Sequence, residues 1–225
     1  SLKGVCMEIT YLGHSCFKLK GKNGTVVVDP FQGSVGFEMS NVSADIVVSS
    51  HDHPDHNAIT KVKGTARREK PFVVDATGEY EVGGISIFGV PTFHDTSKGT
   101  ERGRNTVFVV YMDHLRVCHL GDLGHELTDQ QKTEIGSIDV LLVPVGGKFT
   151  ITPATAVKMV TELDPFYVIP MHYRTDEHDA NLFGELKTLK NFLDEYGVVK
   201  EPVKSLDVDA EKMPEDTEVV VLQRT

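Results

Sequence analysis

The sequence predicts an α/β fold of layered sheets and helices, and three observations lead to this prediction. Short apolar and β-branched segments separated by turns fill the first half of the chain. In the second half, such segments alternate with amphipathic helical patterns, as they do in layered α/β proteins. The length of 225 residues suits one α/β domain, so we expect residues 1–225 to form a single domain.

The expected strands are short segments rich in β-branched, aromatic and other apolar residues. In chain order they cover residues 7–12, 16–19, 25–28, 46–49, 72–74, 85–90, 106–112, 115–120, 140–145, 167–169 and 219–222. The segment 20–24 contains two glycines and an asparagine, which suits a hairpin turn between the second and third strands.

Three segments have apolar residues at three- and four-residue spacing, which predicts helices over residues 128–135, 153–163 and 181–196. Thr152 is expected to cap the second helix, because it precedes a proline at the first helical position. The acidic segment after Gly197 contains two prolines, so we expect a solvated connection to the last strand.

The formal net charge of -10 disfavours a nucleic-acid partner, because phosphate contacts require lysine or arginine. The three cysteines lack C-x-x-C spacing, which predicts no disulfide framework and favours the reducing cytoplasm. No apolar run approaches the roughly 20 residues of a membrane span, and the N-terminus does not resemble a signal peptide. We therefore expect a cytoplasmic protein that acts on a small molecule, without a membrane or nucleic-acid partner. The sequence leaves homo-oligomerisation open.

The strongest functional signal is the segment 50–56, with the sequence SHDHPDH, directly after an expected buried strand. Such crowding of imidazoles and carboxylates is costly as ordinary packing. His51 and His53 can point to the same side of an extended segment and reach one ion. Asp55 and His56 follow the proline, where a helix start can turn them toward a second ion. The spacing therefore suggests two metal half-sites.

Further candidate ligands stand alone: His94, Asp122 and His172 each come shortly after an expected strand. Loops that leave separate strand ends can converge on one cleft. Mixed imidazole and carboxylate ligands suit zinc, with manganese or iron as alternatives. No cysteine lies near the cluster, which favours a catalytic metal site over a structural zinc site.

The order of these motifs resembles the signature of the metallo-β-lactamase superfamily: the cluster 51–56, then His94, then Gly121-Asp122, and finally His172. This resemblance extends over most of the chain. Five motifs further resemble a short, metal-dependent hydrolase branch related to the ascorbate-6-phosphate lactonases. They are YLGHS at residues 11–15, GRNT at 103–106, GDLGH at 121–125, VPVGG at 143–147 and PMHY at 170–173.

The resemblance implies a four-layer αββα sandwich with two divalent metal ions, zinc in the first place, at one edge between the sheets. The implied ligands are His51, His53 and His94 for the first ion, Asp55, His56 and His172 for the second, and Asp122 as a bridge.

The same resemblance implies that the protein is an enzyme, namely a metal-dependent hydrolase in which two metal ions activate a water molecule. Asp55 is the expected catalytic residue, because it could orient this water or accept its proton as well as bind metal. A small ester, lactone or related carbonyl compound is the favoured substrate. Three alternatives stay open: a phosphodiesterase or nuclease, an iron-dependent sulfur dioxygenase, and a non-catalytic metal-dependent binding protein.

Three residues near the ligand motifs are candidate substrate contacts: His14, Arg104 and Tyr173. Tyr173 follows an expected ligand, so it could line the cleft. Arg102 and Arg104 follow the polar stretch 96–101, which is explained equally well as a substrate-facing loop or as the start of an ordinary strand.

The histidines outside the expected ligand set fall into two classes. A hydrogen-bonded structural role is the favoured interpretation of His14, His119 and His125, with a proton shuttle or a substrate contact as the alternative. We expect His114 and His178 at the surface.

Overall fold

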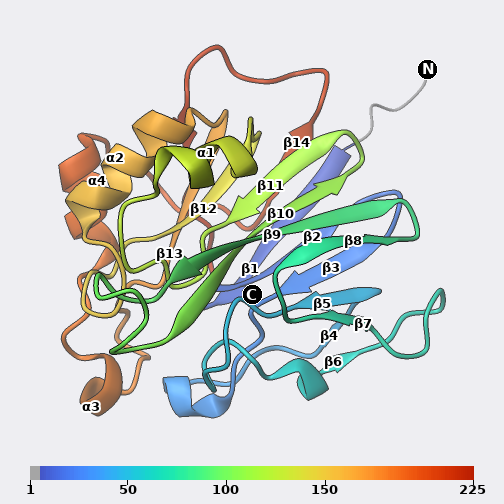
Figure 1. Ribbon diagram of the computed structural model, residues 1–225, viewed down its shortest axis with the longest axis horizontal. Coiled ribbons are helices and arrows are strands. Elements are labelled where there is room, and N and C mark those ends of the chain that lie inside the picture. Colours follow the sequence, from blue (N-terminus) through green and yellow to red (C-terminus); the bar gives the residue numbers. More distant parts are fainter. Residues whose placement is uncertain (1–5) are drawn as a thin grey trace.

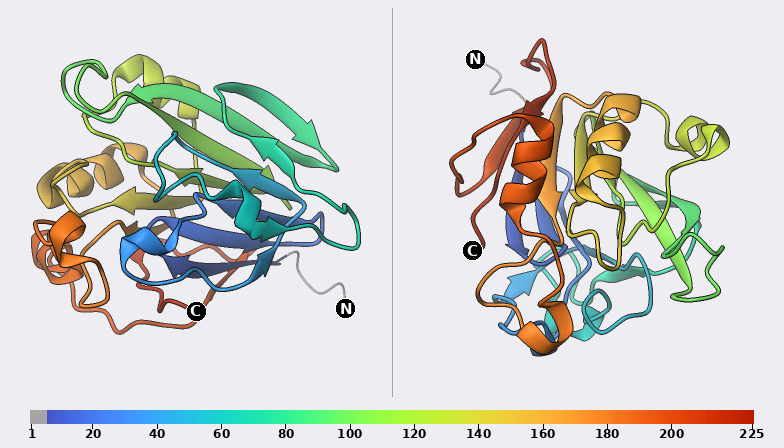
Figure 2. Two further views of the ribbon diagram at one scale, coloured as in Figure 1. Left: turned by 90° about the horizontal axis from the view of Figure 1, so that it is seen from below. Right: turned by 90° about the vertical axis from the view of Figure 1, so that its left-hand side faces the viewer.

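Residues 6–225 are described by the computed structural model, which contains two large β-sheets packed face to face (Figure 1, Figure 2). The six-stranded sheet has the strand order β14-β1-β2-β3-β5-β7. Its strands are β1 (Cys6–Gly13), β2 (Cys16–Lys20), β3 (Thr25–Val28), β5 (Ile46–Val48), β7 (Phe72–Val74) and β14 (Leu206–Asp209). Strands β3, β5 and β7 run parallel, whereas β1 pairs antiparallel with β2 and β14.

The seven-stranded sheet has the strand order β15-β13-β12-β11-β10-β9-β8. Its strands are β8 (Gly78–Val82), β9 (Ile85–Phe93), β10 (Arg104–Met112), β11 (Leu115–His119), β12 (Val140–Pro144), β13 (Tyr167–Met171) and β15 (Glu218–Val219). Strands β11, β12, β13 and β15 run parallel, so their carboxyl ends lie at the same edge of the sheet.

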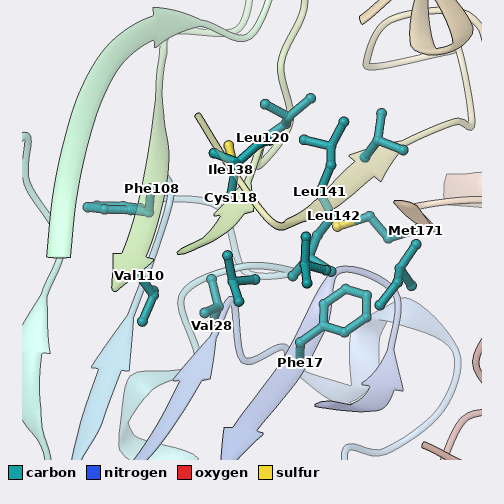
Figure 3. Close-up of a cluster of buried hydrophobic side chains, with 14 of the residues drawn as sticks. Phe17, Val28, Phe108, Val110, Cys118, Leu120, Ile138, Leu141, Leu142 and Met171 are labelled. Carbon is teal, nitrogen blue, oxygen red and sulfur yellow. The ribbon is translucent and has the colours of Figure 1, made fainter. Parts of the chain in front are cut away.

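The core follows from the alternation of side chains along each strand. In β3, Val26 and Val28 belong to a large cluster of buried side chains from both sheets, whereas Val27 belongs to a second cluster. Figure 3 shows part of the large cluster, where Phe17 of β2 points toward Leu142 of β12. Both faces of β3 are therefore buried, as is usual for parallel strands.

Outer layers cover both sheets. Helices α1 (Asp129–Ile135), α2 (Pro153–Leu163) and α4 (Leu189–Tyr196) lie along the seven-stranded sheet (Figure 1). The second hydrophobic cluster lies on the other side of the six-stranded sheet and is completed by short elements. These are the 3-10 helices η1 (Gly33–Val35) and η2 (Ile59–Lys61), the strand pair β4 (Val42–Ser43) and β6 (Val62–Lys63), and helix α3 (Ala180–Phe183). The predicted layered α/β sandwich is confirmed.

Every predicted strand overlaps an observed strand, and Thr152 caps α2 ahead of Pro153 as predicted. Strands β4, β6, β8 and β14 were not predicted from the sequence. Strand β14 lies in the acidic segment that was expected to be a solvated connection, and it pairs with β1, where Val208 is fully buried. That part of the prediction is wrong, because one buried side chain and edge pairing are sufficient to hold a short strand.

The prediction of a single helix over residues 181–196 is also wrong. The chain forms α3, a turn at residues 184–188, and then α4. The backbone N–H of Lys187 donates to the Gly146 carbonyl at 2.7 Å, so the turn bonds to another loop instead of continuing the helix. The backbone N–H of Thr188 donates to Asn191 Oδ1 at 2.9 Å and starts α4.

Cys6, Cys16 and Cys118 are free thiols, and Cys16 and Cys118 are buried. Within residues 6–225, none of the helices has the length and apolar character needed to cross a lipid bilayer.

Candidate metal centre

The predicted ligands lie at the ends of strands from both sheets. The segment 49–56 follows β5, and His94, Asp122 and His172 follow β9, β11 and β13. The Ser50 carbonyl accepts a hydrogen bond of 2.9 Å from the backbone of β10, which ties the histidine-rich loop to the opposite sheet. The four loops meet at one edge of the sandwich, as the resemblance implied.

Asp122 lies at the middle of this cluster and is 2% exposed. Its Oδ2 lies 3.1 Å from Nε2 of both His56 and His94, 3.2 Å from Nε2 of His172, and 3.7 Å from Nε2 of His51. One carboxylate oxygen therefore faces four imidazoles that come from three different loops, which is a suitable arrangement for a ligand shared by two cations.

The remaining predicted ligands form two groups, and the ligand atoms within each group lie within 4.8 Å of one another. The first group is His51, His53 and His94, and the second is His14, Asp55, His56 and His172. The two groups reproduce the two sets of three residues implied by the resemblance, with His14 added to the second set. The structure thus brings all the predicted ligands together.

Buried polar atoms without a hydrogen-bond partner are concentrated in the same place. Among residues 6–225 they are Nε2 of His51 and His56, Nδ1 of His94, both ring nitrogens of His172, Oδ1 of Asp122 and Oγ of Ser15. An unpaired buried polar atom costs about 1–3 kcal/mol, so a cluster of them requires a partner. Imidazole nitrogens and carboxylate oxygens are ligands of zinc, iron and manganese, and the donor set therefore fits a metal ion.

The electrostatic field of the cluster favours positive charge. Burial lowers the pKa of His56, but the carboxylates of Asp122 and Asp55 outweigh burial and raise it well above its usual value. Burial would raise the pKa of Asp122, yet the imidazoles of His172 and His56 hold it well below its usual value. The pKa of His51 is lowered to about 3, mainly by burial, which leaves this ring neutral as a metal ligand must be.

Asp29 supports the cluster and was not predicted from the sequence. Its carboxylate accepts hydrogen bonds from the backbone N–H of Ser50 at 2.7 Å, from Ser50 Oγ at 2.6 Å and from His56 Nδ1 at 2.8 Å. Ser50 Oγ in turn accepts a hydrogen bond of 2.9 Å from His51 Nδ1. Both imidazoles therefore carry their proton on Nδ1 and present Nε2 to the centre. The missed signal was the position of Asp29 directly after a buried strand, which it shares with the predicted ligands.

Asn105 fixes the loop that carries Asp122. Its side-chain amide donates to the Leu120 carbonyl at 3.0 Å, and its Oδ1 accepts from the backbone N–H of Asp122 at 2.9 Å. Gly121 has a φ of 58°, and a Cβ at this position would lie 2.4 Å from Asn105 Oδ1. Glycine is therefore required here by both conformation and space, and the Gly-Asp motif positions Asp122 for a steric reason.

His14 lies fully buried behind Asp55. Its Nε2 lies 3.0 Å from Asp55 Oδ2, and its Nδ1 lies 3.2 Å from Nε2 of His178. The prediction that His178 is a surface residue is wrong, because this side chain packs against His14 and is 7% exposed. His114 is exposed, as predicted. The substrate contact suggested for His14 stays a prediction.

Two other histidines make hydrogen bonds that fit the structural roles favoured for them. His119 is buried, and its Nε2 donates to the Ser15 carbonyl at 2.8 Å while its Nδ1 accepts from the backbone N–H of Gly121 at 3.0 Å. His125 Nε2 accepts a hydrogen bond from the backbone N–H of Phe93 at 3.1 Å. Each ring therefore holds a loop next to the candidate metal centre.

A cavity of about 390 Å³ opens beside the centre, and His53, Asp55, His94 and Asp122 form part of its lining. The lining continues with Arg102, which follows the stretch considered as a substrate-facing loop, and with Phe149, Leu182 and Phe183, which no sequence motif singled out. Its volume is suitable for a small molecule. Tyr173 lines a different cavity, and Arg104 lies in a depression beside His51 and His53, so their substrate roles stay predictions.

Comparison with known proteins agrees with this geometry. Residues 8–172 match the family model of the β-lactamase superfamily domain. A metal-dependent hydrolase of Methanoculleus marisnigri is 32% identical over 93% of this chain and 100% of its own. Another, from Thermococcus onnurineus, is 29% identical over 75% of this chain and 85% of its own.

The solved structure of a proposed Zn-dependent hydrolase of the metallo-β-lactamase superfamily from Thermotoga maritima is similar to this chain throughout. The two chains are 41% identical with a TM-score of 0.77, and the match covers 96% of this chain and 98% of the other. These matches do not distinguish the ascorbate-6-phosphate lactonases from other branches, so that resemblance stays a prediction. The ligand-rich edge between two sheets and these similarities together show that the chain belongs to the metallo-β-lactamase superfamily, as one of its metal-dependent hydrolases.

Proposed function

We propose that this hydrolase cleaves a small ester, lactone or related carbonyl compound with a water molecule activated by two divalent metal ions, most suitably zinc. The proposed ligands are His51, His53 and His94 for one ion, Asp55, His56 and His172 for the other, and Asp122 for both. The observation that carries the proposal is the position of Asp122 Oδ2, which faces imidazoles of both groups at 3.1–3.7 Å.

Two bound cations lower the pKa of a coordinated water and stabilise negative charge on a carbonyl oxygen. In an ester or lactone, water then adds to the carbonyl carbon, the bond to the alcohol oxygen breaks, and the alcohol takes a proton from the water. The chain itself needs to supply only positioning groups and a proton acceptor.

Asp55 is suited to the acceptor role, because it lines the cavity and its side chain is 20% exposed, whereas Asp122 is 2% exposed. Burial opposes ionisation of Asp55, but His56 and His14 hold its pKa well below the usual value. The carboxylate is therefore ionised and can accept a hydrogen bond from water. His14, on the buried side, fixes the orientation of Asp55 through the 3.0 Å contact.

The proposal is tested by elemental analysis and turnover of the protein loaded with zinc, manganese or iron. We expect about two ions per chain and hydrolysis of at least one lactone or carboxylic ester in a panel that also contains a chromogenic phosphodiester. His53→Ala should lower metal content and turnover together, while His114→Ala, at an exposed histidine, should change neither. Turnover of the phosphodiester alone, or full activity without metal, would contradict the proposal.

A further inference from the structure

The cavity beside the metal centre contains a positive charge without a carboxylate partner. Arg102 is half-buried in its lining, and it is the one lysine or arginine among the described residues that form it. The ion pairs of residues 6–225 with nitrogen–oxygen distances up to 4.0 Å do not include Arg102. The neighbouring Glu101 carboxylate accepts a hydrogen bond from Ser97 Oγ at 2.6 Å instead. The guanidinium is therefore available to a ligand in the cavity.

The position of Arg102 is fixed from both ends. Its backbone N–H donates to Asp95 Oδ2 at 2.8 Å, and the same carboxylate accepts backbone hydrogen bonds from Ser97, Gly99 and Glu101. Its guanidinium lies over the ring of Phe149, with Cζ 5.2 Å from the ring centroid. The loop that follows His94 is thus built to hold a cation beside the metal centre.

An apolar surface accompanies this cation. Phe149, Leu182 and Phe183 line the same cavity, and Leu182 is 55% exposed although it is a large hydrophobic residue. Leu182 and Phe183 belong to α3, which comes directly before the unpredicted break at residues 184–188. An exposed leucine beside a catalytic centre is explained if an apolar ligand covers it.

We propose that the substrate carries a carboxylate on an apolar body, that Arg102 binds the carboxylate, and that Phe149, Leu182 and Phe183 contact the apolar body. This inference rests on the proposed ester or lactone hydrolysis. It specifies the acyl group of the substrate as an apolar chain that carries a carboxylate. A guanidinium binds a carboxylate through two parallel hydrogen bonds, which gives orientation as well as affinity.

Charge favours a carboxylate over a phosphate monoester at this position. One guanidinium neutralises a singly charged carboxylate, whereas a phosphate carries roughly -1.5 to -2 charges at neutral pH. The excess negative charge would lie in a cavity that Glu101 also lines, in a protein with a net charge of -10.

Three matched esters test this inference on the zinc-loaded protein: 4-nitrophenyl octanoate, mono-4-nitrophenyl octanedioate and 4-nitrophenyl 8-(phosphonooxy)octanoate. They share the reacting bond and the apolar chain and differ in the charged end. We expect kcat/KM for the octanedioate ester to exceed that for the octanoate ester by about 10- to 100-fold, the range of one hydrogen-bonded ion pair.

Arg102→Gln should abolish this preference through a rise in KM for the octanedioate ester that exceeds any change for the octanoate ester. Arg102→Lys should keep part of the preference, because it keeps the charge without the planar fork. Arg68→Gln, at an exposed arginine outside the cavity lining, is the matched control and should behave as the wild type. Equal rates for the two esters in the wild type, or a preference that survives Arg102→Gln, would overturn the inference. A faster reaction of the phosphate ester would overturn the choice of carboxylate.

If none of the esters is hydrolysed, a measurement of ligand binding still tests this inference separately from the proposed function. Octanoate and octanedioate each offer one carboxylate to the metal ions, but only octanedioate has a second one for Arg102. Calorimetric titration of the zinc-loaded protein should then show roughly tenfold tighter binding of octanedioate in the wild type and equal binding in Arg102→Gln. Equal affinities in the wild type would overturn the inference by this route as well.

Discussion

The two sides of the candidate metal centre differ in how far they are enclosed. On one side, His53 and His94 line the cavity, and His53 is half-buried. On the other side, His56 and His172 are fully buried with the equally buried His14 behind them, and Asp55 alone of this group lines the cavity. Asp122 faces imidazoles of both groups, so the two sides share one carboxylate but not the same surroundings.

This difference separates two tasks within one centre. The enclosed side has more hydrogen-bonded support, since His56 is held by Asp29 and Asp55 is held by His14. Ligands fixed in this way bind a metal more tightly than ligands that lie free. The open side adjoins Arg102 and the apolar lining, so it is where a substrate can reach the centre. We therefore expect the enclosed side to hold its ion and the open side to exchange it.

The largest effect is expected from a substitution of Asp122, the carboxylate that the two sides share. Asp122→Asn keeps the shape of the side chain but removes the negative charge that faces four imidazoles, so both ions should be lost and turnover should fall by more than about 100-fold. Elemental analysis and turnover measure this. Asp207→Asn, at an exposed aspartate of β14, is the control and should retain both. Full metal content in Asp122→Asn would show that this carboxylate is not a bridge.

A smaller effect, limited to one of the two ions, is expected when a ligand that belongs to only one group is replaced. His53→Ala should leave about one ion per chain and nearly normal thermal stability, because the side chain is half-buried. His172→Ala should lose the other ion and also about 1–3 kcal/mol of stability, because the ring is fully buried. Metal content and thermal unfolding of both variants decide this. The comparison of the two sides fails if both variants lose both ions to the same degree.

The sequence predicted the fold class and the convergence of the candidate ligands for a physical reason. His51, His94 and His172 follow strands whose hydrophobic patterns are strong, and parallel strands that end at one edge bring their loops together. Motif order then pointed to the family, and the structure agrees with it.

Other features depend on tertiary contacts that no local pattern contains. Asp29 supports the centre only because Ser50 and His56, far along the chain, turn toward it. His178 is buried only because it meets His14 across the fold. The break before α4 depends on a hydrogen bond from Lys187 to Gly146, and this break places α3 at the cavity.

The role of His14 on the enclosed side can be resolved by two substitutions. If His14 orients Asp55, His14→Ala should weaken binding of one ion by about 10- to 100-fold, and His14→Gln should restore most of it because the amide can still donate to Asp55. Metal titration of the metal-free protein measures the affinity of each ion. If both variants are equally impaired, His14 binds the metal itself, as its place among the ligand atoms within 4.8 Å also allows. His178→Ala, which removes the next contact outward, should have a smaller effect than His14→Ala.

The smallest effect is expected on the open side, at Asp95, which binds no substrate in the proposed scheme but holds the loop from His94 to Arg102. Its carboxylate accepts four backbone hydrogen bonds; burial opposes ionisation, but these donors lower its pKa to about 2. Asp95→Asn replaces one acceptor oxygen by an amide and should lower the free energy of unfolding. Because Arg102 is then held less firmly, the preference for mono-4-nitrophenyl octanedioate over 4-nitrophenyl octanoate should fall about 3-fold. This decrease is smaller than the loss of preference expected for Arg102→Gln. Thermal unfolding and the ratio of the two kcat/KM values measure these effects separately. A drop in stability without any change in that ratio would show that the loop does not position Arg102.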